Sequence, residues 1–133
     1  MASDASAMQP FIGSWELVDF IRTSSAGETD RPLGAVPAGL ISYTADGTVS
    51  VHLVATDGRP GRLMPEYSGY YGAFRVDTDR QVVIHDIEQA SHEWLRGTQQ
   101  VRQYAFDGDR LTLSAAIDEE RMELSWQRRF TGQ

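Results

Sequence analysis

Apolar residues alternate with polar ones along most of this chain, which is the period of a half-buried β-strand. Eight short runs carry the pattern, and no run of ten or more residues shows the spacing of an amphipathic helix. The alternation predicts strands at residues 13–22, 39–44, 48–54, 70–76, 81–88, 98–106, 111–115 and 121–128.

Most of these predicted strands are joined by short turns. Asp46-Gly47 and Asp107-Gly108 each lie between two alternating runs, where Asp-Gly is a strong hairpin signal. Sequential hairpins without crossover helices predict an antiparallel meander, and eight strands can close into a barrel that leaves no exposed edge. We therefore predict an all-β fold, an eight-stranded antiparallel up-and-down barrel with a central pocket. Residues 1–10 are expected to be a flexible segment, and residues 11–130 a single domain.

Alternation also predicts which side chains face the barrel interior. The aromatic face of the sixth predicted strand carries Gln100 and Arg102 as well. An unpaired buried Arg102 would cost several kcal/mol, so it must meet a carboxylate such as Glu88, a ligand or water. In the fifth strand the two faces are almost equally apolar, so the facing of His85 stays open. The other expected inward residues are Trp15, Leu17, Ile41, Tyr43, Val49, Val51, Leu53, Tyr70, Phe74, Val76, Tyr104, Phe106, Leu111, Leu113, Met122, Leu124 and Trp126.

Composition narrows the classes of partner. The 133 residues carry a formal charge of −7, and the one basic cluster is Arg128-Arg129, which argues against nucleic acid. No stretch approaches the roughly 18 apolar residues of a membrane helix. The first eight residues lack the basic and apolar regions of a signal peptide, and the chain has no cysteine. We therefore expect a cytoplasmic protein that binds neither nucleic acid nor membrane.

The candidate chemistry is sparse. The three histidines lie on separate segments without close ligand spacing, so no metal site is predicted. Gly-x-Ser-x-Gly, a phosphate-binding glycine loop and a dinucleotide fingerprint are missing from the sequence, and we predict no cofactor. His85 is the best acid–base candidate because histidine titrates near neutral pH, although a hydrogen-bonded strand histidine explains it as well.

Gly13-Ser14-Trp15 resembles the Gly-x-Trp motif of lipocalins. In that family the Trp packs under an Arg of the last strand, which Arg128 matches, so the resemblance implies that Arg128 stacks on Trp15 at the closed end. Further stretches between about residues 11 and 129 resemble a microbial group of lipocalin-like domain proteins. They are residues 13–18, 32–34, 39–47, 71–72, 83–85, 94–102, 108–113 and 124–128.

The resemblance implies a barrel with a pocket and no built-in cofactor. Some small barrels of this kind in natural-product pathways resemble cofactor-free cyclases or isomerases that fold a reactive polyene or polyketide. The family pattern often has a second His after the position of His85, where this chain has Asp86. A mechanism that needs a His pair is therefore not expected.

The favoured hypothesis is a cofactor-free cyclase or isomerase acting on an apolar, polyketide-like intermediate. A non-catalytic carrier of a hydrophobic small molecule is the main alternative, and a barrel filled by its own side chains is the third. The sequence does not identify the ligand, and it leaves open whether the protein forms a homodimer. The catalytic candidates are Tyr70, His85 and Gln100, and the ligand-binding candidates are Tyr43, Val51, Leu53, Phe74, Trp94, Arg102, Leu113 and Leu124.

Overall fold

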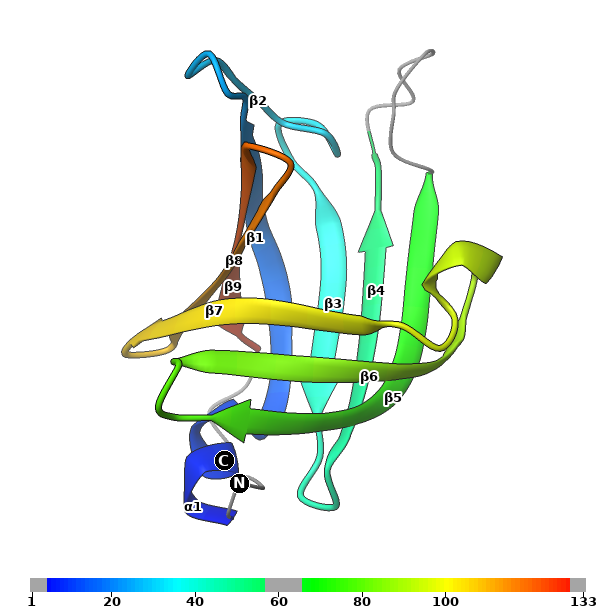
Figure 1. Ribbon diagram of the computed structural model, residues 1–133, viewed down its shortest axis with the longest axis vertical. Coiled ribbons are helices and arrows are strands. Elements are labelled where there is room, and N and C mark those ends of the chain that lie inside the picture. Colours follow the sequence, from blue (N-terminus) through cyan, green and yellow to red (C-terminus); the bar gives the residue numbers. More distant parts are fainter. Residues whose placement is uncertain (1–4, 57–65, 130–133) are drawn as a thin grey trace.

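A computed structural model describes residues 5–56 and 66–129 of the chain. Each strand pairs antiparallel with the next around one sheet, and β1 pairs with β9 to close a barrel (Figure 1). The predicted eight-stranded barrel is confirmed, with the two-residue β2 as an addition at its rim. The strands are β1 (Gly13–Thr23), β2 (Thr29–Asp30), β3 (Ala38–Tyr43), β4 (Thr48–Val54), β5 (Tyr67–Asp77), β6 (Val82–Ala90), β7 (Gln99–Asp107), β8 (Arg110–Ile117) and β9 (Glu120–Arg128).

The short strand β2 lies in the connection between β1 and β3, a segment rich in turn-forming residues. It pairs with Arg22 and Thr23, the last two residues of β1. Two hydrogen bonds join the Arg22 guanidinium to the Asp30 carboxylate, at 3.0 and 2.6 Å. β3 pairs with the first residues of β1, so β2 continues the pairing where β3 has left that strand.

One end of the barrel is closed by the helical turns α1 (Ala5–Met8) and η1 (Gln9–Phe11), which lie across it in Figure 1. Phe11 is completely buried and packs edge-on against Tyr43, Tyr104 and Phe106, with ring centroids 5.0–5.2 Å apart. Such aromatic packing fills this end of the interior. Free space inside the barrel is therefore left toward the opposite end.

The closed end also holds the predicted stack of Arg128 on Trp15. The guanidinium carbon of Arg128 lies 4.1 Å from the centre of the Trp15 ring. The same guanidinium donates to the carbonyl oxygens of Ile12 and Pro10, at 2.9 and 3.0 Å. The Trp15 indole donates to the carbonyl of Phe11 at 2.9 Å. The stack is confirmed, and it ties η1 to the first and last strands.

β5 curves strongly, so that its second half runs with β6 and β7 across the other strands (Figure 1). The register between β5 and β6 shifts between Tyr71 and Gly72. A Cβ atom at Gly72 would collide with the carbonyl oxygen of Asp86, so glycine allows the two backbones to approach at the bend. Tyr70 precedes this bend and Phe74 follows it, and both pack against the core.

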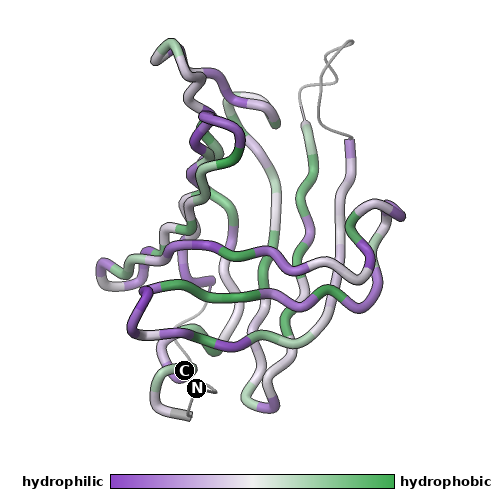
Figure 2. Tube along the Cα trace, in the orientation of Figure 1, coloured by the Kyte–Doolittle hydropathy of each residue, from purple (hydrophilic) through white to green (hydrophobic). Residues whose placement is uncertain are grey.

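Hydrophobic and hydrophilic residues alternate along the strands, and the turn between β5 and β6 is hydrophilic (Figure 2). Two places break the alternation. A bulge in β1 between Leu17 and Asp19 turns Phe20 inward, three residues after Leu17. In β6 all six residues from Val82 to Ile87 except Asp86 are buried, which is why alternation left its facing open. His85 faces inward and is 2% exposed.

Candidate functional site

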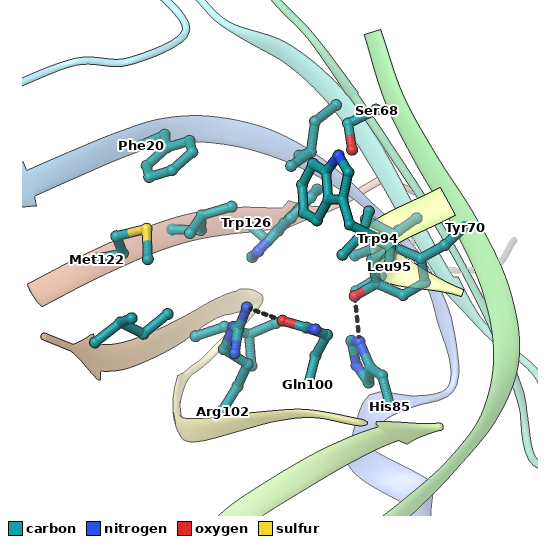
Figure 3. A pocket seen from close by; sticks show the side chains of 16 residues that line it. Phe20, Ser68, Tyr70, His85, Trp94, Leu95, Gln100, Arg102, Met122 and Trp126 are labelled. Atoms are coloured by element: carbon teal, nitrogen blue, oxygen red, sulfur yellow. Dashed lines mark hydrogen bonds between the residues drawn. The ribbon is translucent and has the colours of Figure 1, made fainter. Parts of the chain in front are cut away.

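A cavity of about 290 Å³ occupies the open half of the barrel, and Figure 3 shows the 16 side chains that line it. Trp94 is 67% and Ile117 43% exposed, which places them at the mouth. His85 and Trp126 are almost fully buried, at 2% and 1% exposure, and lie at the inner end. Most of the wall is apolar, formed by Phe20, Ile41, Val51, Leu53, Leu95, Leu113, Ile117, Met122 and Leu124.

A hydrogen-bonded chain of three side chains lies at the inner end of the cavity. Both nitrogens of the His85 ring are engaged: Nε2 lies 2.8 Å from the Tyr43 hydroxyl and Nδ1 lies 2.7 Å from the Tyr70 hydroxyl. Tyr43 comes from β3, Tyr70 from the part of β5 before its bend, and His85 from β6. Tyr70 and His85 line the cavity, whereas Tyr43 lies behind them in the aromatic core.

The surroundings of Tyr43 determine which atom donates in each hydrogen bond of this three-residue chain. Its hydroxyl is fully enclosed, and His85 is the one hydrogen-bond partner it has among the described residues. If Nε2 carried the proton, the Tyr43 proton would be buried without an acceptor, at a cost of about 1–3 kcal/mol. Tyr43 therefore donates to Nε2, and the Nδ1 proton is donated to the Tyr70 oxygen. The proton of the Tyr70 hydroxyl is then free to point into the cavity.

Burial keeps all three members of the chain in their neutral forms. It lowers the pKa of His85 to about 3, and the positive charge of Arg102 acts in the same direction. Burial raises the pKa of Tyr43 well above its usual value and also raises the pKa of Tyr70, while Arg102 opposes both increases. At neutral pH these three hydrogen-bonded side chains thus offer a hydrogen-bond donor, not a charge, to the cavity.

Arg102 on β7 is the one charged side chain among the described residues that line the cavity. Its Nη2 donates to Gln100 Oε1 at 2.8 Å, and its Nη1 donates to the carbonyl oxygen of Val101 at 3.0 Å. The Gln100 amide in turn donates to the Thr98 hydroxyl at 3.1 Å, which donates to the carbonyl oxygen of Leu95 at 2.6 Å. This network fixes the guanidinium relative to η2 (Glu93–Leu95) at the cavity mouth.

The structure brings most of the predicted site residues to this one cavity, and their roles stay predictions. Tyr43 and Phe74 are the two candidates outside the lining, since both are buried in the core next to it. The alternative partner for Arg102, Glu88, is exposed on β6, and no ion pair joins the two among the described residues. The candidates that line the cavity are Val51, Leu53, Tyr70, His85, Trp94, Gln100, Arg102, Leu113 and Leu124.

Other lining residues were not predicted as site residues. Phe20 reaches the cavity because of the bulge in β1, and the spacing of three between Leu17 and Phe20 was the available signal. Leu95 is buried on the short 3-10 turn η2, whose sequence showed no strand pattern. Ser68 and Ile117 lie near strand ends at the rim, where alternation carries little information.

The remaining histidines are not among the described residues that line the cavity. His52 contacts the hydroxyl groups of Ser50 and Tyr67, and His92 stacks on Trp94. Within residues 5–56 and 66–129, no group of three or more His, Cys, Asp or Glu side chains is arranged to hold a metal ion. The helical segments in the same ranges are all too short or too polar to cross a membrane.

Comparison with protein families supports what the geometry indicates. A family model described as a lipocalin-like domain matches residues 12–130, nearly the whole chain. A comparison with curated proteins gives no match. The matched range contains all the strands of the barrel and every residue that lines the cavity. This chain therefore belongs to the lipocalin-like domain family, whose barrel is suited to binding a small hydrophobic ligand.

Proposed function

We propose that the protein is a cofactor-independent cyclase or isomerase for an apolar, polyketide-like intermediate that carries a ketone. The observation that carries this proposal is the hydrogen-bonded chain from Tyr43 through His85 to Tyr70. It holds the Tyr70 hydroxyl at the inner end of an apolar cavity and leaves its proton free to point into that cavity. A fixed donor in a site that excludes water stabilises charge that develops on a carbonyl oxygen.

The lining favours a rearrangement without proton transfer. Both His85 nitrogens are already hydrogen-bonded, its pKa is about 3, and no carboxylate is found among the described lining residues. The lining therefore offers no strong base at neutral pH. The fitting reaction is a ring closure within one polyene ketone, in which two π bonds are replaced by two carbon–carbon σ bonds. No atom, proton or electron enters or leaves the molecule.

The cavity would contribute to the rate in two ways. Its apolar wall holds a flexible chain in the folded conformer from which the ring closes, which reduces the entropy cost of the step. The Tyr70 proton then draws electron density toward the ketone oxygen as the new bonds form. A volume of about 290 Å³ is at the small end for ligand sites, so we expect a product with one or two rings.

The test uses a linear trienone in which a diene and an enone are joined by a three-carbon tether. We expect the protein to accelerate its cyclisation over the rate in buffer. Tyr70→Phe should lower this acceleration about tenfold or more with little effect on binding, because the donor acts mainly in the transition state. Tyr71→Phe is the matched control: Tyr71 is the next residue of β5 and is half-exposed outside this cavity, so it should keep the wild-type rate.

A non-catalytic carrier is the second candidate, and the largely apolar wall with its exposed mouth favours it. A carrier would bind the trienone, measured by calorimetry, without changing its rate of cyclisation. That result for the wild-type protein, or equal rates for the wild type and Tyr70→Phe, would contradict the cyclase proposal.

A further inference from the structure

Arg102 has more hydrogen-bonding capacity than its neighbours use. A guanidinium carries five N–H donors. The described residues accept two hydrogen bonds from it, at Val101 and Gln100, and both acceptors are uncharged. A largely buried guanidinium without a carboxylate is costly to the fold, and in a ligand site that cost is offset when a ligand supplies the missing charge. Arg102 is thus positioned by the protein but not neutralised by it.

Trp126 adds a further unused donor to the same cavity. It is 1% exposed, and none of the described residues accepts a hydrogen bond from its indole Nε1. Buried polar atoms are nearly always paired, so an orphaned donor in a cavity wall needs an explanation. Trp126 and Arg102 both line the cavity, and in Figure 3 they lie to the left of Tyr70 and His85. Unused donors of two side chains, Arg102 and Trp126, therefore line the same cavity as Tyr70.

We propose that Arg102 and Trp126 form a subsite for a carboxylate, so that the substrate is an amphipathic acid with an apolar body. This inference rests on the proposed function and specifies its substrate class. A carboxylate presents two oxygens in the plane that a guanidinium fork matches, and the indole N–H can bond to a remaining lone pair. A doubly charged oxyanion such as a phosphate fits less well, because its desolvation in a small apolar cavity costs more.

The charge distribution makes such a subsite selective. The chain as a whole has a formal charge of −7, and Arg102 is the one charged group among the described residues of the lining. The exterior therefore does not attract anions in general, and recognition depends on this one cation. The network from Leu95 through Thr98 and Gln100 assigns Gln100 the role of a positioning residue, because its oxygen and nitrogen both serve to hold Arg102 in place.

The experiment measures binding of octanoate and octan-1-ol by calorimetry at neutral pH. These probes share an apolar chain and differ in the charged head group. We expect the wild-type protein to bind octanoate about tenfold or more tightly than octanol, the size expected for a hydrogen-bonded charge pair. Arg102→Met should abolish the preference, Arg102→Lys should retain part of it, and Trp126→Phe should reduce it a few-fold. Arg110→Met is the matched control, because Arg110 is exposed and bonds to Gln127 away from the cavity.

The proposal is overturned if wild-type protein binds both probes equally or binds neither. It is also overturned if Arg102→Met, shown to be folded by its thermal transition, keeps the preference. The readout is separate from catalysis, so the two proposals fail independently. A carboxylate preference without trienone cyclisation would leave the subsite standing and remove the cyclase. Cyclisation that depends on Tyr70 without a carboxylate preference would do the reverse.

Discussion

The barrel contains a tryptophan and an arginine at its closed end and again in its cavity. The two sets differ in how far their hydrogen-bond donors are paired within the protein. At the closed end, Arg128 lies on the Trp15 ring, both of its Nη atoms donate to backbone carbonyls, and its Nε lies 3.5 Å from the Asp109 carboxylate. The Trp15 indole is also hydrogen-bonded. In the cavity, the Trp126 indole has no acceptor among the described residues, and Arg102 has no carboxylate there.

This contrast shows that residue type alone does not distinguish a structural Trp or Arg from one that is available to a ligand. The closed-end set is fully used within the fold, so its removal should reduce stability. The cavity set keeps unused donors, so its removal should reduce ligand binding and should lower stability less than removal of the closed-end set. The following experiments compare matched substitutions in the two regions.

The largest difference in stability between the two regions is expected for the Trp→Phe substitutions. Trp15→Phe leaves the Phe11 carbonyl without its donor and removes much of the ring surface under Arg128, so we expect a loss of about 2–4 kcal/mol in the free energy of unfolding. Trp126→Phe loses ring volume in the same way but removes an N–H that has no acceptor among the described residues, so it should cost about 1–2 kcal/mol. Urea denaturation of both variants measures this, and equal costs would refute the contrast.

The second experiment uses pH. Folding lowers the pKa of His85 from 6.5 to about 3, so the unfolded chain binds a proton that the fold does not. The stability linked to this group is therefore complete above about pH 6.5 and is lost as the pH falls toward 3. Between about pH 7 and pH 5 we expect a loss of about 2 kcal/mol from this residue.

His85→Gln should remove that portion of the pH dependence, measured as the difference between urea unfolding curves at the two pH values. His52→Gln, which lies outside the cavity, should retain the wild-type dependence. Arg128→Met should lower stability by the same amount at both pH values, because the closed-end contacts involve no histidine. A wild-type dependence that persists in His85→Gln would show that other groups cause it.

The smallest difference in stability between the two regions is expected for the Arg→Met substitutions. Arg128→Met removes two hydrogen bonds to carbonyls and the stack on Trp15, and should lower the unfolding free energy by about 1–2 kcal/mol. Arg102→Met replaces a largely buried charge without a carboxylate by an apolar side chain, so stability should stay the same or rise by up to about 1 kcal/mol. Differential scanning calorimetry in the absence of ligand measures both. A larger loss for Arg102→Met would mean that this guanidinium is structural.

The sequence predicted the closed barrel because alternation and turns are local signals. It predicted most of the cavity wall for the same reason, since side chains of one strand face share the interior. Alternation was not sufficient where one strand is buried on both faces, as in β6, or where a bulge reverses the facing, as before Phe20. The contact between Tyr43 and His85 joins β3 to β6, two strands that do not pair with each other.

The polar contacts of the site were harder to predict than its lining. A carboxylate was the simplest partner for Arg102, yet the guanidinium bonds to Gln100 two residues away on its own strand. The unused Trp126 donor could not be expected, because alternation predicts that Trp126 faces inward but not whether its indole N–H meets an acceptor. Hydrogen-bond pairing inside a barrel depends on rotamers and on the distance across the interior, and neither is encoded in a two-residue period.

The pairing of β1 with β9 has a consequence for the order of events during synthesis. β1 is among the first described segments to leave the ribosome and β9 is the last, so their contact has to wait for the whole sheet. Until then β1 has one unpaired edge, which can pair with strands of other chains. Closure between such distant segments is also slow compared with forming a hairpin. The nascent chain is therefore most prone to aggregate just before its last strand is released.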